Sequence, residues 1–116
     1  MLNCNNNICA IVVTLNPDTS ALERLLDSLI IQSCTIIVID NGSKKELLNE
    51  IKSWFNSKKN TLCHLLELGE NYGIACAQNR GIIWAKNQHF NYVLFLDQDS
   101  DPPVNLVSLL CHAFTN

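Results

Sequence analysis

Four apolar, β-branched segments recur along the chain, and their spacing limits the fold more than any other feature. Their first residues lie roughly 30 positions apart, which is the length of one strand–helix–strand unit. Apolar residues in the intervals between them recur at helical spacing, as Leu22, Leu25, Leu26 and Leu29 do in the first interval. The pattern predicts four strand–helix units in succession. The strands are expected at residues 8–15, 35–39, 61–68 and 92–96.

Short polar signatures predict where the first two helices begin. Ser20 is followed three residues later by Glu23, which makes a capping box at the start of the first helix. Ser43 and Glu46 repeat this arrangement ahead of the second helix. In both places we expect the serine hydroxyl to accept a hydrogen bond from a free backbone N–H of the first turn.

The third and fourth helices are predicted from apolar faces and from proline. The third is expected over about residues 73–87, and the fourth is shorter, with Pro102 and Pro103 in its first turn. Small and apolar residues on one side of the third helix are expected to pack against the sheet. They are Ile74, Ala77, Gly81, Ile82 and Ala85.

The strands read as nearly continuous apolar runs, which is typical of parallel sheets covered by helices on both faces. Right-handed crossovers leave few topologies for such a chain. We expect an α/β, Rossmann-like sheet of order 3-2-1-4, and the flavodoxin-like order 2-1-3-4 is the alternative. In the first order the chain reverses between strands 1 and 4, so a ligand is expected at their carboxyl ends.

Composition limits the class of protein further. The 116 residues suffice for one domain, and 47% hydrophobic against 16% charged residues is a globular composition. The net charge of −3 predicts no nucleic-acid partner. No apolar run approaches the roughly 18 residues of a membrane span, and the start lacks the features of a signal peptide. We therefore expect a cytoplasmic location, with peripheral contact at the inner face of the membrane as a further option.

Six cysteines are scattered along the chain without any C-x-x-C pair. Most lie within apolar runs, where a thiol behaves as a small hydrophobic side chain. We expect them to be reduced and structural. Cys63 and His64 are adjacent, but no second pair of ligands for zinc lies nearby.

Polar residues gather where the predicted strands end. Residues 40–43 read Asp-Asn-Gly-Ser, and the fourth strand runs into Asp97, Asp99 and Asp101. Positions i and i+2 of an extended chain face the same way, so Asp97 and Asp99 would repel each other without a cation or a proton between them. Mg²⁺ or Mn²⁺ would suit these oxygen ligands, whereas a solvated acidic turn is the alternative.

Several familiar sites are absent from the sequence. A calcium-binding EF-hand starting at Asp97 fails, because Pro102 stands where glycine is required and Ser108 where a bidentate Glu is required. The dinucleotide-binding, P-loop and nucleophile-elbow motifs do not occur either.

Four separated segments resemble the start of family 2 glycosyltransferases, which have the GT-A fold, use nucleotide-sugar donors and invert the sugar configuration. The segments are residues 11–17, 38–43, 71–81 and 94–100. Residues 96–100, Leu-Asp-Gln-Asp-Ser, are most similar to rhamnosyltransferases. That resemblance implies dTDP-L-rhamnose as donor, with a UDP-sugar as the alternative, and a role in polysaccharide biosynthesis.

The resemblance also implies roles for individual residues. Asp40 would accept a hydrogen bond from the base, and Asp97-Gln98-Asp99 would be the D-x-D motif, with Asp99 holding Mg²⁺ or Mn²⁺ most directly and Asp97 beside it. The implied nucleotide-sugar-binding residues are Thr14, Asn16, Pro17, Asp40, Asn41, Asn71, Gly73, Asn79, Asp97 and Gln98, and the implied metal ligands are Asp97 and Asp99.

In the family, the catalytic base that inverting transfer requires lies beyond the D-x-D strand. No Asp or Glu follows Asp101, so no catalytic residue is assigned in this chain. We expect residues 1–116 to be the donor-binding part of an enzyme that acts on a saccharide or lipid-linked acceptor. A non-catalytic nucleotide-binding or structural module is the alternative. Truncation would open one edge of the fourth strand, so we expect self-association there or a C-terminal helix folded over it.

Overall fold

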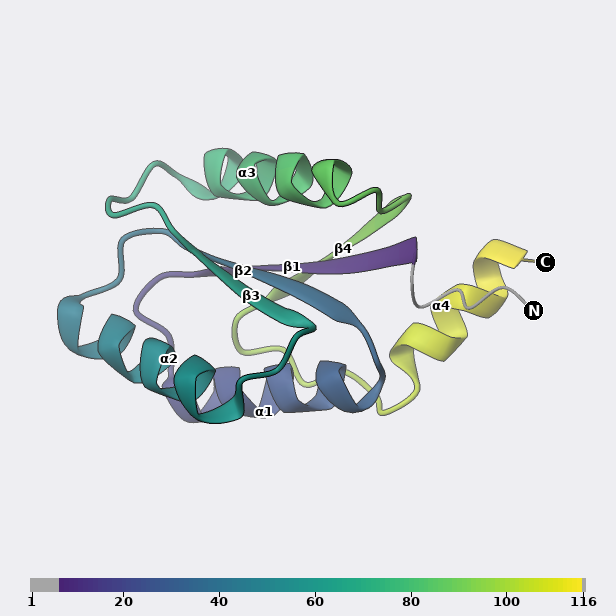
Figure 1. The fold of residues 1–116 in the computed structure, drawn as a ribbon, viewed down its shortest axis with the longest axis horizontal. Helices are drawn as coiled ribbons and strands as arrows, with labels where there is room; N and C mark the ends of the chain where they lie inside the picture. The colour runs from purple at the N-terminus through teal and green to yellow at the C-terminus, as the bar shows by residue number, and fades with distance from the viewer. Residues whose placement is uncertain (1–6, 116) are drawn as a thin grey trace.

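The computed structural model describes residues 7–115 and contains the four strand–helix units that the sequence predicts (Figure 1). The third strand is shorter than expected, while the other strand positions agree to within two residues. The elements are β1 Ile8–Thr14, α1 Thr19–Ile31, β2 Thr35–Asp40, α2 Lys45–Lys58, β3 Cys63–Glu67, α3 Ile74–Asn87, β4 Tyr92–Asp97 and α4 Leu106–Thr115.

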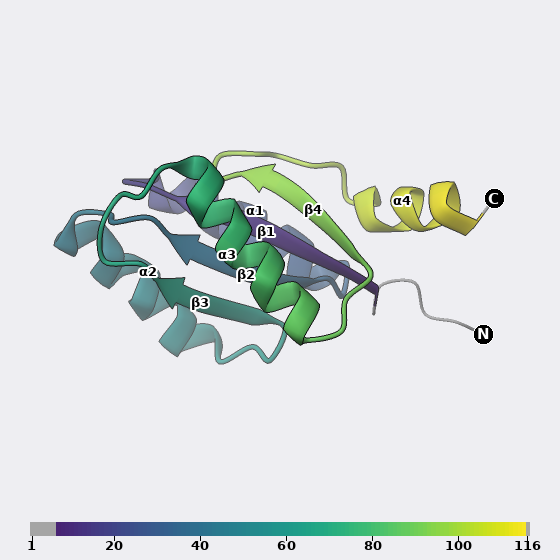
Figure 2. The ribbon, with the colours of Figure 1, turned by 90° about the horizontal axis from the view of Figure 1, so that it is seen from above.

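The strands form one parallel sheet of order β3-β2-β1-β4, which confirms the Rossmann-like order and excludes the flavodoxin-like one. Strand β1 is central and pairs with β2 from Cys9↔Thr35 to Thr14↔Asp40. On its other side it pairs with β4, and this ladder ends at Val13↔Asp97. The carboxyl ends of all four strands therefore lie along one edge of the sheet (Figure 2).

Helices α1 and α2 cover one face of the sheet and α3 lies across the other (Figure 1). The four leucines of α1 are buried as their spacing predicts, and they pack against the side chains that β1 and β2 point to this face. Burying a leucine side chain contributes about 2 kcal/mol, so this layer supplies much of the driving force for folding.

Helix α3 lies close to the sheet because small residues form its inner side. Ala77, Gly81 and Ala85 are buried, and a Cβ at Gly81 would stand 2.6 Å from Ile11 Cγ2. Ile74 and Ile82 were also expected on this face, but their side chains are 60% and 38% exposed. The helix is too narrow to cover its whole side of the sheet, so these two residues remain beside the uncovered part.

Three helix starts differ from the sequence-based expectation. Asp18 caps α1, and its carboxylate accepts a hydrogen bond from Ala21 N at 3.1 Å, whereas Ser20 lies inside the helix. Lys44 occupies the cap of α2 without a side-chain hydrogen bond. The hydroxyl of Ser43 does not cap this helix, because it is hydrogen-bonded to Asp40 and to Asn16 N. Helix α4 begins only at Leu106, so Pro102 and Pro103 precede it.

Strand β4 is an edge strand, paired only with β1 among the described residues. Helix α4 lies past the end of the sheet instead of along this edge, so the expected helical cover is not observed (Figures 1 and 2). Val93 and Phe95 are 37% and 43% exposed on the side that α3 leaves uncovered. Self-association through this edge stays a prediction.

The cysteines divide into two groups. Cys9, Cys34 and Cys63 are free and buried, as expected of structural thiols. Cys111 is half-buried, but Cys76 is exposed, so the expectation that the cysteines fill the core is wrong for Cys76. Cys4 lies outside the described residues.

The longest helices, α2 and α3, have 14 residues each. A helix that crosses a bilayer needs about 20 apolar residues. Within residues 7–115, no helix is long and apolar enough to cross a membrane.

Candidate functional site

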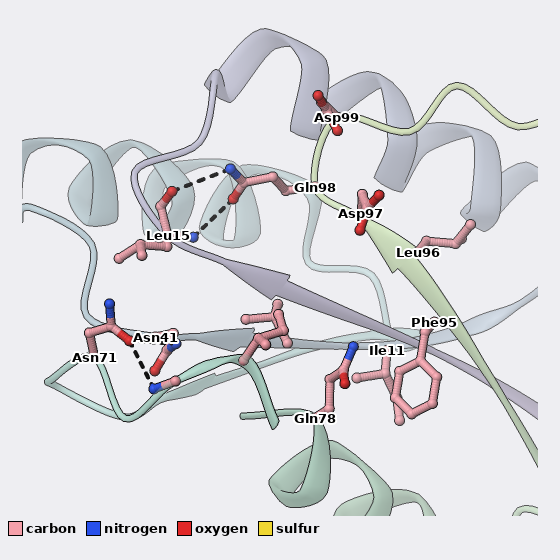
Figure 3. A pocket seen from close by; sticks show the side chains of 13 residues that line it. Ile11, Leu15, Asn41, Asn71, Gln78, Phe95, Leu96, Asp97, Gln98 and Asp99 are labelled. Atoms are coloured by element: carbon pink, nitrogen blue, oxygen red, sulfur yellow. Dashed lines mark hydrogen bonds between the residues drawn. The ribbon is translucent and has the colours of Figure 1, made fainter. Parts of the chain in front are cut away.

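A pocket of about 480 Å³ lies at the carboxyl ends of β1 and β4, where the strand order predicts a ligand. Strand β1 and the end of β4 form one wall, and the segment leading into α3 forms the other (Figure 3). The pocket is lined by Ile11, Val13, Leu15, Asn41, Asn71, Gly73, Ile74, Gln78, Phe95, Leu96, Asp97, Gln98 and Asp99.

The carboxylates at the end of β4 are open to solvent. Asp97 is the last residue of the strand, and Asp99 stands in the loop that follows. Ser100 N donates a hydrogen bond to Asp97 O at 3.0 Å, which turns the chain away from the sheet. We expected the two residues to face the same way on an extended strand, but the turn separates them, although both line the pocket.

Asp97 and Asp99 fit a divalent cation that is shared with a bound phosphate group. Among the described residues, no three His, Cys, Asp or Glu side chains gather closely enough to enclose a metal ion. Mg²⁺ is usually held by one or two carboxylates together with water and the phosphates of a substrate. Two accessible carboxylates at the mouth of a pocket match this donor set.

The carboxylate at the end of β2 has a different environment. Asp40 is 1% exposed and accepts hydrogen bonds from Thr14 Oγ1 at 2.8 Å, Ser43 N at 3.0 Å and Ser43 Oγ at 2.5 Å. Ser43 Oγ in turn accepts a hydrogen bond from Asn16 N at 2.9 Å, and Asn16 Oδ1 accepts one from Lys44 N at 2.7 Å. This network joins the loops after β1 and β2.

Two asparagines join the loops after β2 and β3. Asn41 Nδ2 donates to Asn71 Oδ1 at 3.1 Å, and Asn41 Oδ1 accepts from Tyr72 N at 3.0 Å. Asn71 Oδ1 also accepts from Gly73 N at 2.9 Å, which shapes the turn into α3. The carboxamide of Asn71 is thereby fixed in one orientation at the pocket wall (Figure 3).

The loops after β1 and β4 are joined by Gln98. Leu15 N donates to Gln98 Oε1 at 2.9 Å, and Gln98 Nε2 donates to Leu15 O at 3.3 Å. Side-chain hydrogen bonds therefore connect all four strand ends around the pocket.

The structure brings together about half of the residues that the resemblance implies. Those that line the pocket are Asn41, Asn71, Gly73, Asp97, Gln98 and Asp99. Those that do not line it are Thr14, Asn16, Pro17, Asp40 and Asn79. Thr14, Pro17 and Asp40 are buried, and Asn79 lies exposed on α3. Protein donors engage both carboxylate oxygens of the buried Asp40, and its expected hydrogen bond to the base stays a prediction.

Seven residues that line the pocket were not among the predicted site residues: Ile11, Val13, Leu15, Ile74, Gln78, Phe95 and Leu96. Gln78 lines it from α3, and Phe95 lines it from β4. Gln78 follows Ile74 by four positions, which places both on one side of a helix and could have indicated a shared surface. No sequence signal marked Phe95 as a pocket residue, because the apolar run around it reads like an ordinary buried strand.

Two solved structures superpose closely on this chain. A mannosyltransferase from Pyrobaculum calidifontis, solved with GDP-Man and Mn²⁺, superposes with a TM-score of 0.71 and is 21% identical. The match covers 90% of this chain and 31% of that one. TarS of S. aureus superposes with a TM-score of 0.72 at 19% identity, over 94% of this chain and 32% of its own. These likenesses show the GT-A fold.

A relative found by sequence comparison is similar to this chain at higher identity. The dTDP-rhamnosyl transferase RfbF of Shigella flexneri is 37% identical over 99 residues, which are 83% of this chain and 30% of that protein. The chain thus spans about a third or less of the length of the proteins it matches. The profile of the family described as "Glycosyl transferase family 2" matches residues 9–116. The chain therefore belongs to glycosyl transferase family 2.

Proposed function

We propose that the pocket binds a nucleotide sugar, with its diphosphate held through Mg²⁺ or Mn²⁺ by Asp97 and Asp99. The observation that carries this proposal is the pair of solvent-exposed carboxylates at the pocket mouth, at the carboxyl ends of the central strand and β4. The fold relative solved with GDP-Man and Mn²⁺ supports the same combination of ligands.

Each part of the pocket has a separate task in this proposal. The divalent cation would stabilise the negative charge that gathers on a diphosphate leaving group. Asn71 would contact the nucleotide, because Asn41 Nδ2 and Gly73 N engage its Oδ1 and no hydrogen bond from its Nδ2 to a described residue is present. Apolar side chains of β1 and β4 would form the floor under the nucleotide. Asp40 would have an indirect role, because its hydrogen bonds hold the loops after β1 and β2 in position beside the pocket.

The proposed donor is dTDP-L-rhamnose, and the proposed reaction is inverting transfer to a saccharide or lipid-linked acceptor. The rhamnosyltransferase relative supports the sugar and the base, since its identity of 37% extends over most of this chain. The chain covers 30% of that relative, so the reaction is proposed for a protein that includes this chain.

Calorimetric titration of the chain with dTDP, in the presence and absence of Mn²⁺, tests the donor site. We expect binding with Mn²⁺ and at least about 10-fold weaker binding without it, because two carboxylates alone repel a diphosphate. Asp99→Asn should reduce the Mn²⁺-dependent affinity by about 10-fold or more, since it removes one ionised metal ligand.

Asp101→Asn is the matched control, because Asp101 lies two residues further along the same loop and does not line the pocket. It removes the same charge and should leave the affinity within about 2-fold. Binding that is independent of the metal, or an Asp99→Asn variant that binds like the unmodified chain, would contradict the proposal.

Nucleotide binding without transfer is the second candidate. The described residues that line the pocket include only the two carboxylates assigned to the metal, so none remains there to act as a general base. Mass spectrometry of dTDP-rhamnose incubated with a saccharide acceptor and a protein that includes this chain separates the two functions. A rhamnosylated product supports transfer, whereas binding with no product supports the second candidate.

A further inference from the structure

Gln98 occupies the position where the pairing of β1 and β4 stops. The last paired residues are Val13 and Asp97. One step further along β1, the carbonyl of Thr14 accepts a hydrogen bond from Asn41 N at 2.8 Å, so β1 stays associated with β2. The backbone of the β4 loop, in contrast, turns away at Asp97 and Ser100. The backbone of the β4 loop therefore offers no hydrogen-bond partner to the N–H and C=O groups of Leu15.

The side chain of Gln98 supplies that partner. Its Oε1 accepts from Leu15 N at 2.9 Å and its Nε2 donates to Leu15 O at 3.3 Å. A carboxamide carries a donor and an acceptor side by side, as a peptide group does, so it can satisfy both backbone groups of one residue. A glutamate could accept from Leu15 N but could not donate to Leu15 O at neutral pH. The chemistry at this position thus matches glutamine in particular.

Both polar atoms of Gln98 are engaged with Leu15, so its carboxamide is held in one orientation beside the pocket. Its expected contact with the nucleotide sugar stays a prediction. Gln98 lies between Asp97 and Asp99 in the sequence. Its two hydrogen bonds to Leu15 therefore fix the part of the loop that connects the two carboxylates. Figure 3 shows Gln98 reaching across to Leu15, while Asp97 and Asp99 lie along the loop that leaves the end of β4.

We propose that Gln98 is a positioning residue that fixes the Asp97–Asp99 loop for cation binding through its two hydrogen bonds to Leu15. The inference rests on the proposed function, since it concerns how the two metal ligands are presented. Groups that orient metal ligands through hydrogen bonds commonly change metal affinity by 10-fold or more when they are removed.

Gln98→Met is the variant that tests this role, because methionine has a similar length and shape and lacks both hydrogen-bonding groups. We expect its Mn²⁺-dependent affinity for dTDP to fall by about 10-fold. Gln88→Met, at the exposed end of α3, makes the same substitution far from the pocket and should bind like the unmodified chain. The unfolding midpoints of the two variants should agree, which separates positioning from a general loss of stability.

Amide hydrogen exchange measured by NMR gives a readout that needs no ligand. In Gln98→Met the Leu15 amide should exchange at least about 10-fold faster, since it loses its acceptor, while the amides inside β1 keep their rates. An unchanged Leu15 rate would overturn the inference. So would a faster rate accompanied by unchanged Mn²⁺-dependent binding, and in that case the proposed function would stand. If the unmodified chain shows no metal-dependent binding, the proposed function fails and the inference fails with it.

Discussion

The ends of β2 and β4 both carry aspartate, yet they differ in almost every physical respect. Asp40 at the end of β2 is 1% exposed and accepts three hydrogen bonds from Thr14 and Ser43. Asp97 and Asp99 at the end of β4 are exposed and line a pocket. A buried carboxylate is stable only when protein donors satisfy it, whereas an exposed one remains free for a cation. The same residue type therefore organises the site at one strand end and is available to a ligand at the other.

The difference follows from the position of the strands in the sheet. Strand β2 has a neighbour on each side, so the loop at its end is enclosed by the loops after β1 and β3. Strand β4 is paired on one side only, and α3 does not cover its exposed face. An edge position leaves room for a pocket, and an interior position does not.

The largest effect is expected where the β2 end is packed most tightly. A Cβ on Gly42 would stand 2.6 Å from the backbone carbon of Glu70, and the residue has a φ of +90°. Gly42→Ala should therefore cost about 4 kcal/mol of unfolding free energy, because steric overlap adds to backbone strain.

Gly69→Ala is the control for that substitution. Gly69 has a φ of +84°, but nothing lies within 4 Å of its added Cβ, so strain alone remains and about 1–2 kcal/mol is expected. Urea unfolding of both variants measures the difference. Equal losses would show that the loops after β2 and β3 do not pack as closely as described.

The next effect compares the aspartates directly. Asp40→Ala should destabilise the chain by about 3 kcal/mol, because it leaves the Thr14 hydroxyl and the Ser43 N–H without their acceptor in a buried setting. Asp97→Ala should change stability by less than about 0.5 kcal/mol, since its side chain is exposed. Urea unfolding at neutral pH checks both values, and a comparable loss for the two variants would remove the distinction drawn between the strand ends.

A smaller effect is expected for each buried thiol. Burial raises the pKa of Cys9 and Cys63 to about 12 and that of Cys34 to about 11. In the unfolded chain these thiols ionise from about pH 9, so between pH 9 and 11 the unfolded state binds fewer protons and stability falls as the pH rises. At pH 10 the loss is about 1.4 kcal/mol for a single thiol.

Urea unfolding of Cys63→Ala and of the unmodified chain at pH 8 and pH 10 measures that loss. The variant should lose about 1.4 kcal/mol less between the two values, because one ionising thiol is gone. Brief alkylation at pH 8 followed by peptide mapping compares this buried thiol with the exposed thiol of Cys76. Cys76 should be labelled and Cys63 protected, and labelling of both at equal rates would contradict the described burial.

Much of the fold could be predicted from the sequence because it depends on local pattern. The leucines of α1 and the apolar strands appear at the expected positions, and parallel strands with right-handed crossovers left few orders to choose between. Details that depend on distant partners were predicted less well. Ser43 was expected to cap α2, but its hydroxyl donates to Asp40 and accepts from Asn16 N across the strand ends.

The sequence by itself determined the four strand–helix units, the gathering of polar residues at the strand ends and the acidic pair at the end of β4. Tertiary structure alone decided which of these residues are available to a ligand. Thr14 and Asp40 are separated by 26 positions and Leu15 and Gln98 by 83, yet each pair is joined by hydrogen bonds. Burial and hydrogen bonding are properties of neighbours in space, so they become visible only when the sheet has brought its strand ends together.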